Sequence, residues 1–213
     1  MHKLIILISS IILLVACQAQ NASPIDAETQ DIETTPPIYF GMPNEISWQD
    51  TSAGWQVEGQ SILLTGTVFM PDGKTPAQNI LLYYYHTDTD GRYVYRSSVK
   101  RSLPPNKMGM THGYLRGWVK TNEDGQYSIY TIKPQTYPSR DEPAHIHITI
   151  KEPGKQDHYY IDDILFDDDP LLSLERRKKL ENRGGNGVVR LEEKDDFYIG
   201  ERNIVLGLNV PDY

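Results

Sequence analysis

The feature that most constrains the fold is a regular series of short β-type segments separated by Asp-Gly turns. "SILLTGTVF" is followed by the turn "MPDGKTP", "NILLYYYHT" by "DTDG", and "YLRGWVKT" by "NEDG" and then "QYSIYTI". Short segments rich in β-branched and aromatic residues form strands, and Asp-Gly pairs between such segments are strong hairpin signals. The pattern therefore predicts an all-β fold, an antiparallel β-sandwich with long loops.

The C-terminal third adds one short helix and a last strand to this prediction. Residues 171–183 follow the acidic "DDDP", contain the basic "RRKK" and end before "GGNG". An acidic start, a basic end and a glycine stop are typical of a helix. The segment "RNIVLGLNV", residues 202–210, is predicted to be the last strand.

The first residues have the features of an export signal. Lys3 precedes the apolar run "LIILISSIILLVA", which is short for a membrane span and has the basic start of a secretory signal. The run ends in "LLVAC", which resembles the lipobox of bacterial lipoproteins. We expect residues 1–17 to be a lipoprotein signal with the lipid on Cys17, which would anchor the protein at the cell envelope, on the periplasmic face of a bacterial membrane. An ordinary signal peptide with an incidental cysteine, or an uncleaved anchor, is the alternative.

Residues 18–37, "QAQNASPIDAETQDIETTPP", are polar, acidic and proline-ended. This composition predicts a flexible tether, followed by one domain over residues 38–213. Cys17 is the only cysteine, so the domain has no internal disulfide. The net charge of −8 argues against nucleic acid as a partner, and we expect contact with a membrane only through the lipid.

The segment "EPAHIHITI", residues 142–150, places two histidines inside an apolar strand. Because side chains of a strand alternate between its faces, His145 and His147 share one face while three isoleucines share the other. The two imidazoles start about 6–7 Å apart at the backbone, within reach of a common metal ion. Two polar residues on a wetter strand face are the alternative interpretation.

Two tyrosines out of 14 occupy turns near this strand. Tyr93 follows a turn in "HTDTDGRYVYR", and Tyr137 lies in "TIKPQTYPSRDEPAHIH", eight positions before the first histidine. Taken singly, each is equally compatible with an ordinary buried tyrosine whose hydroxyl is hydrogen-bonded.

Taken together, these motifs resemble the intradiol ring-cleavage dioxygenases, typified by protocatechuate and catechol dioxygenases. The similarity runs from "ILLTGTVFMPDGKTPAQNILLYYYHTDTDGRY" through "RGWVKTNEDGQYSIYTIKPQTYP" to "PAHIHITI" and "LFDDDP", in the order of the family. In that family two tyrosinates and two histidines hold a non-haem iron. The resemblance implies that Tyr93, Tyr137, His145 and His147 are the ligands of Fe(III).

The implied chemistry follows from these ligands. Anionic oxygen donors stabilise the high charge of Fe(III), and imidazoles complete the set. The resemblance implies a catechol-type substrate that chelates the iron, the release of the tyrosinate of Tyr137 to accept a substrate proton, and attack by O2 that opens the ring between its two oxygenated carbons.

The sequence departs from the family pattern at two places. Glu142 stands three residues before the first histidine, where the family usually has an arginine that stabilises negative charge on the ring. The possible substitutes are Arg140, Arg92 and Arg116. Asp163 stands where a glutamine is common.

Two other classes of protein are also compatible with the sequence. The run "TGTVFMPDGKTPAQNILLYYY" also resembles transthyretin-like extracellular domains, which are non-catalytic binding modules. A cupin-type metal site also uses two histidines one residue apart, but it needs a glutamate three or four residues later and another histidine further on. Here the nearest glutamate is Glu152, and His158 follows too soon.

Overall fold

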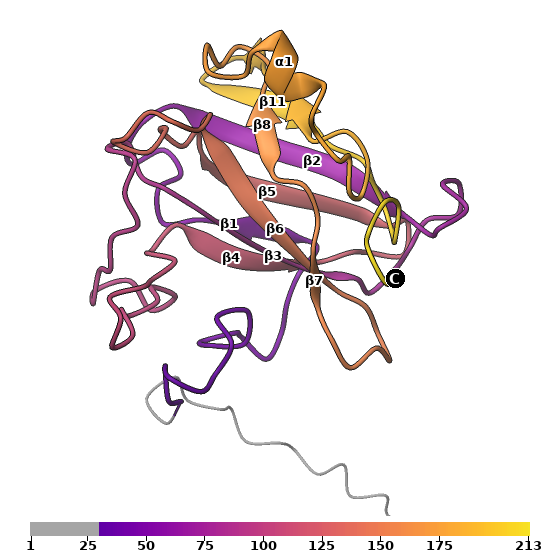
Figure 1. The fold of residues 1–213 in the computed structure, drawn as a ribbon. Helices are drawn as coiled ribbons and strands as arrows, with labels where there is room; N and C mark the ends of the chain where they lie inside the picture. The colour runs from indigo at the N-terminus through magenta and orange to yellow at the C-terminus, as the bar shows by residue number, and fades with distance from the viewer. Residues whose placement is uncertain (1–29) are drawn as a thin grey trace, which may run out of the picture.

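The structure of the protein, a computed structural model, is described over residues 30–213, and its regular secondary structure is nearly all β-strand (Figure 1). In chain order the elements are β1 (Gln49–Thr51), β2 (Ser61–Phe69), β3 (Leu81–His86), β4 (Arg116–Lys120), β5 (Gln126–Ile132), β6 (His145–Lys151), β7 (Tyr159–Tyr160), β8 (Ile164–Phe166), α1 (Leu174–Arg177), β9 (Val188–Val189), β10 (Glu192–Lys194), β11 (Phe197–Glu201) and β12 (Ile204–Val205).

The strands form two six-stranded sheets. The first has the order β1-β5-β2-β11-β10, with β12 also paired to β2, and the second has the order β4-β3-β6-β8-β9, with β7 paired to β6. The predicted all-β sandwich is confirmed. The sheets are mixed rather than antiparallel, because β1 lies parallel to β5, β11 and β12 lie parallel to β2, and β9 lies parallel to β8. Long connections make these parallel pairs possible, and no local turn motif encodes them.

The core lies between the two sheets and includes one face of β6. Ile62 and Leu64 of β2 are fully buried in it. Ile146, Ile148 and Ile150 of β6 belong to the same cluster and are at most 1% exposed. The opposite face of β6, which carries the two histidines, is therefore the outer face of the second sheet, as the alternation predicts.

The N-terminal segment 37–46 covers part of this outer face. Arg116 of β4, which is fully buried, donates two hydrogen bonds to backbone carbonyls of the segment and one to the Tyr83 hydroxyl of β3. Its guanidinium carbon also lies 4.7 Å from the ring centre of Trp118. Arg116 therefore stabilises the packing of this segment on the sheet.

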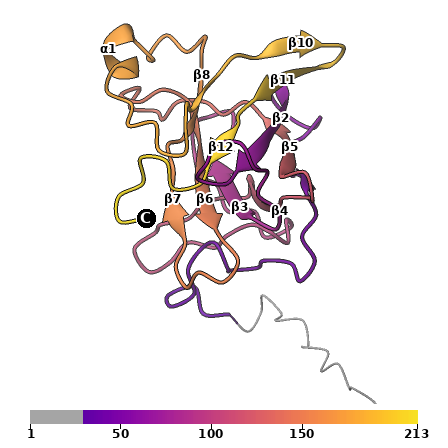
Figure 2. The ribbon, with the colours of Figure 1, turned by 90° about the vertical axis from the view of Figure 1, so that its right-hand side faces the viewer.

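The predicted helix over residues 171–183 is much shorter in the structure. α1 spans only Leu174–Arg177, with Ser173 as its N-cap, and lies at one end of the molecule (Figure 2). None of its residues is buried, and Leu174 is 76% exposed. Since short helices gain most of their stability from packing an apolar face, nothing extends this one.

The predicted last strand over residues 202–210 is also wrong in its extent. Only Ile204–Val205, β12, pairs with β2, and the preceding strand β11 ends at Glu201. Gly207 and Asn209 have φ angles of 71° and 56°, which turn the chain away from the sheet.

The predictions for the N-terminus fall largely outside the described residues. This applies to the signal at 1–17, to Cys17 and to residues 18–29 of the tether. Residues 30–37 form turns, and Glu33 accepts a hydrogen bond from the backbone of Lys107. The tether itself stays a prediction. In the part of the chain that is described, no helix is long and apolar enough to cross a membrane.

Candidate metal centre

The structure brings the four predicted ligands together on the outer face of the second sheet. His145 and His147 are the first and third residues of β6. Tyr93 follows the turn after β3, and Tyr137 lies in the loop between β5 and β6. Residues from three separate segments therefore meet at one point, although single motifs gave no indication of their spacing.

The two tyrosine-bearing loops are tied to each other. The backbone N–H of Gln135 donates to the carbonyl of Asp88 at 3.2 Å. Gly91 has a φ of 72°, and a Cβ atom there would lie 2.0 Å from the carbonyl oxygen of Thr136. Only glycine permits both this backbone conformation and this close approach.

The four side chains form a continuous series of short contacts. The Tyr137 hydroxyl lies 3.1 Å from Nε2 of His145 and 2.9 Å from the Tyr93 hydroxyl. The Tyr93 hydroxyl lies 3.0 Å from Nε2 of His147. Two phenolic oxygens and two imidazole nitrogens therefore converge.

The hydrogen-bond partners of Nδ1 determine the tautomer of each histidine. Nδ1 of His145 lies 2.7 Å from the carbonyl oxygen of Pro143, and Nδ1 of His147 lies 2.9 Å from Oδ1 of Asp163. Both oxygens only accept hydrogen bonds, so each Nδ1 carries a hydrogen. In a neutral ring, Nε2 then presents its lone pair toward the tyrosines.

The number of hydrogens does not match the number of contacts. With neutral imidazoles, three contacts share only the hydrogens of the two phenols. One of the contacts must then bring two lone pairs face to face, which is repulsive. A cation bound among the four atoms converts all of these lone pairs into ligands, so the donor set is better satisfied with a metal ion than without one.

The contact lengths also leave room for a single ion. The three contacts of 2.9, 3.0 and 3.1 Å have ordinary hydrogen-bond lengths, and two donor atoms that each lie about 2.1 Å from one ion can be this far apart.

Burial raises the pKa of both phenols. Tyr93 is affected mainly by burial and next by its hydrogen bond with Tyr137. Burial also raises the pKa of Tyr137; the hydrogen bond with Tyr93 opposes this effect, and the Glu142 carboxylate adds to it. The protein environment alone therefore favours phenols, and a bound cation is needed to produce tyrosinates near neutral pH.

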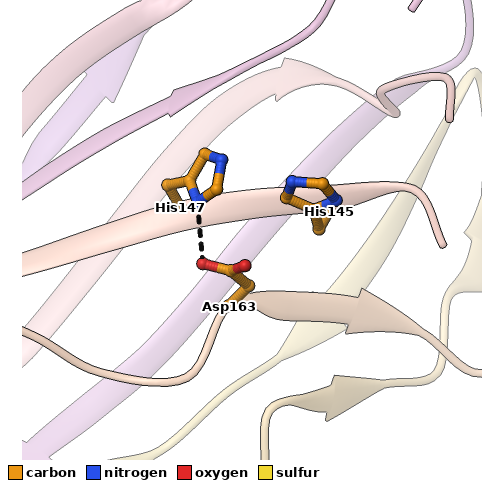
Figure 3. A group of neighbouring side chains, drawn as sticks. All are labelled: His145, His147 and Asp163. Carbon is orange, nitrogen blue, oxygen red and sulfur yellow. Dashed lines mark hydrogen bonds and ion pairs between the residues drawn. The ribbon is translucent and has the colours of Figure 1, made fainter. Parts of the chain in front are cut away.

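A second set of candidate ligands overlaps the first. His145, His147 and Asp163 can each offer a ligand atom within 4.8 Å of the others (Figure 3). However, Asp163 contacts Nδ1 of His147, while the tyrosines contact Nε2 on the other side of the ring. With the rings as they lie, Asp163 is a partner of His147 and not a fifth ligand of the same ion.

Two aromatic residues that the sequence analysis missed pack beside the site. Tyr85 of β3 is the cross-strand neighbour of His147, and the two rings stack with their centres 4.4 Å apart. His112 stacks on the other face of Tyr85 at 3.6 Å. The alternation in "YYYH" places Tyr85 on an outer face, but only the pairing of β3 with β6 shows which residue it contacts.

None of the three arginines considered as substitutes for the family arginine hydrogen-bonds to the four ligands. Arg116 holds the N-terminal segment, and Arg92 is exposed. Arg140 is also exposed but lines a cleft of about 710 Å³ together with Tyr137. Lys133, on the same cleft, is paired with Asp168 at 2.7 Å. Of the four ligand side chains, Tyr137 alone lines this cleft.

Comparison with known proteins agrees with this geometry. A family described as "Dioxygenase" matches residues 44–182, which is more than half of the chain and includes all four converging side chains. The chain belongs to the intradiol dioxygenase family. This membership argues against the transthyretin-like and cupin alternatives, and it agrees with the resemblance found in the sequence.

Curated relatives show the same family at low identity. The chain is 27% identical over 152 residues to catechol 1,2-dioxygenase of Acinetobacter baylyi, covering 63% of this chain and 44% of that enzyme. It is 30% identical over 126 residues to the protocatechuate 3,4-dioxygenase beta chain of Burkholderia cepacia, covering 55% of this chain and 49% of that one. The chain thus spans about half the length of these two relatives.

Solved structures agree on the fold. The dioxygenase domain of a dioxygenase and carbohydrate-binding fusion protein from Streptomyces sp. SirexAA-E aligns with a TM-score of 0.55 and 20% identity, over 78% of this chain and 91% of that one. An intradiol ring-cleavage dioxygenase from Tetranychus urticae aligns with a TM-score of 0.51 and 21% identity, over 75% and 85% of the two chains. Both confirm the sandwich.

Proposed function

We propose that the protein is a non-haem Fe(III) dioxygenase that uses O2 to cleave a catechol-type ring between its two hydroxylated carbons. The observation that carries the proposal is the series of three contacts, 2.9 to 3.1 Å long, from His145 through Tyr137 and Tyr93 to His147. Phenolate oxygens are hard donors that favour a trivalent ion, and imidazole suits iron. Membership of the intradiol dioxygenase family supports the same ion and reaction.

The positions of the two tyrosines support different roles for them. Tyr137 lines the cleft, whereas Tyr93 does not and is enclosed between Tyr85, Tyr137 and His147. An incoming catechol therefore reaches Tyr137 first. Its phenolic oxygen, once ionised, can accept a proton from a substrate hydroxyl and then move away from the centre. Tyr93 and the two histidines, which are held by other contacts, keep their positions.

The protein binds and orients, while the cofactor provides the redox chemistry. Bound Fe(III) would supply a chelation site for both catechol oxygens and activate the ring toward O2. Pro143 and Asp163 fix the tautomers of the two histidines through Nδ1. Tyr85 stacks on His147 and limits its tilt.

The charge of Glu142 near Tyr137 predicts slow turnover of simple catechols. Glu142 is exposed, and its carboxylate acts on Tyr137 from the position where the family usually has an arginine. A negative charge there opposes the build-up of negative charge on the ring in the transition state. Because the group is exposed, solvent screens much of this effect and activity should be reduced rather than abolished.

The test is oxygen consumption by iron-loaded protein with a panel of catechols. The wild type should consume oxygen, and Tyr137→Phe should lose both the activity and part of the visible absorption. Tyr95→Phe is a matched control, because Tyr95 is close in sequence but 44% exposed. If the wild type binds Fe(III) with its tyrosinate absorption and consumes no oxygen with any catechol, the protein is a metal-binding module and not a dioxygenase.

A further inference from the structure

Strand register places Asp163 directly beside His147. The antiparallel pairing of β6 with β8 sets His145 opposite Leu165 and Ile146 opposite Ile164. Extending this register by one step places His147 opposite Asp163, the residue just before β8, and side chains at one register position point to the same face. The carboxylate consequently reaches the imidazole, with Oδ1 at 2.9 Å from Nδ1 (Figure 3).

The two histidines have different partners. Nδ1–H of His145 donates to the neutral carbonyl of Pro143, whereas Nδ1–H of His147 donates to the carboxylate of Asp163. A hydrogen bond to an ionised acceptor is roughly twice as strong as a neutral one. It also makes the imidazole a better electron donor at its other nitrogen. Nε2 of His147 is therefore the more strongly donating of the two.

The backbone of Asp163 is fixed by a hydrogen bond to its carbonyl and by the burial of the residue that follows it. Arg202, which is 1% exposed, donates from Nη1 to the backbone carbonyl of Asp163 at 2.9 Å. The next residue, Ile164, is fully buried in the core. The Asp163 side chain itself is 35% exposed. This backbone fixation limits the positions that the carboxylate can take beside the ring.

We infer that Asp163 is a positioning residue that keeps His147 in the tautomer needed to bind the metal and whose negative charge strengthens binding of a trivalent ion over a divalent one. The second half of this inference rests on the proposed function. Two tyrosinates and the Asp163 carboxylate together carry three negative charges beside a trivalent cation. Reduction to the divalent ion leaves one negative charge without compensation, so the carboxylate stabilises the ferric form.

The first experiment needs no metal. Nitrogen-15 NMR of histidine side chains in the apoprotein, at about pH 8, where free imidazole with its pKa of about 6.5 is neutral, reports which ring nitrogen carries the hydrogen. In the wild type both histidines should carry it on Nδ1. Asp163→Ala should shift His147 toward the Nε2–H form, because the acceptor is gone. His145 should not change in the same variant and serves as the internal control.

The second experiment measures Fe(III) binding by competition with a chelator. Asp163→Asn keeps an oxygen that accepts the hydrogen bond but removes the charge, so His147 should keep its tautomer while Fe(III) binds about 10- to 100-fold more weakly. If the loss is confined to the ferric form, the midpoint potential rises by about 59 mV for each tenfold. Asp167→Asn, which removes an exposed carboxylate paired with Arg177, should change neither quantity.

The outcomes separate this inference from the proposed function. If wild-type His147 carries its hydrogen on Nε2, or if Asp163→Ala leaves the tautomer unchanged, the inference is wrong whatever the protein does with iron. Tautomers as expected in a protein that never develops the tyrosinate absorption would contradict the proposed function and leave the orienting role intact. If Asp163→Asn binds Fe(III) as tightly as the wild type, the carboxylate charge has no effect on the ion. Complete loss of binding in Asp163→Asn, with binding retained in Tyr93→Phe, would make Asp163 a ligand instead.

Discussion

Replacing Gly91 with alanine tests whether the close approach of the two tyrosine-bearing loops creates the metal centre. The Cβ atom that Gly91→Ala adds would lie 2.0 Å from the carbonyl oxygen of Thr136. Carbon and oxygen atoms rarely approach closer than about 3.3 Å, so the loops must separate by about 1.3 Å. Because the clashing atom belongs to the backbone, no rotamer change relieves it.

The magnitude of the effect has two parts. A left-handed φ of 72° costs an alanine about 1–2 kcal/mol. Loss of the hydrogen bond from Gln135 to Asp88, which joins the two loops, costs about another 1 kcal/mol. We therefore expect Gly91→Ala to lower the free energy of unfolding by about 2–3 kcal/mol. The displacement should also reduce ring cleavage by about a hundredfold, as misplacement of reacting groups by 1 Å typically does.

Gly73→Ala is the matched control, since Gly73 has a φ of 67° and no atom within 4 Å of its hypothetical Cβ. It should cost only the conformational strain, about 1–2 kcal/mol, and leave iron binding unchanged. Urea unfolding of the apoproteins and visible absorption at saturating Fe(III) measure both effects. Equal destabilisation and equal absorption in the two variants would refute the role given to Gly91.

The site and the N-terminal sequence support three further predictions. Burial keeps Tyr93 and Tyr137 protonated up to pH values above their usual pKa of about 10, so binding of Fe(III) should release one proton from each. The affinity for Fe(III) should therefore rise about a hundredfold for each unit of increase in pH. Calorimetry in buffers of different ionisation enthalpy should count one released proton fewer in Tyr93→Phe. Glu142→Arg should raise turnover of catechol about tenfold, or about 1.4 kcal/mol, while Glu142→Gln gives a smaller gain; equal rates in all three proteins would exclude a role for this charge. Cys17→Ser should release the protein from membranes or leave it unprocessed, and normal processing with membrane fractionation would contradict the lipobox prediction.

The sequence predicts the strands better than it predicts their arrangement. Alternation in "HIHITI" correctly separates the core face from the histidine face, because a strand has a strict period of two. The Asp-Gly turns correctly separate β2, β3, β4 and β5, but they do not close the hairpins that such turns predict: β2 and β3 lie in different sheets, as do β4 and β5, and a long connection joins β3 to β4. In contrast, β1, β9 and β11 pair in parallel with strands far away in the sequence, and no turn motif encodes such a pairing.

The site shows the same division between local and long-range information. Four residues could be predicted as ligands because each lies in a recognisable local motif, and their side chains do converge in the structure. The contact between Asp163 and His147 depends on the register of β6 and β8, and the stacking of Tyr85 on His147 depends on the pairing of β3 with β6. The sequence therefore showed Asp163 only as a departure from the family and did not show what it contacts.

The visible spectrum of the protein loaded with Fe(III) tests the central claim most directly. Tyrosinate bound to Fe(III) produces a charge-transfer band in the visible range, so the wild type should be coloured at one iron per chain. Tyr93→Phe and Tyr137→Phe should each lose about half of the band or fail to retain iron, whereas Tyr95→Phe, at an exposed position, should match the wild type. A colourless protein with iron bound, or a band that survives both substitutions, would contradict the assignment of Tyr93, Tyr137, His145 and His147 as the ligands.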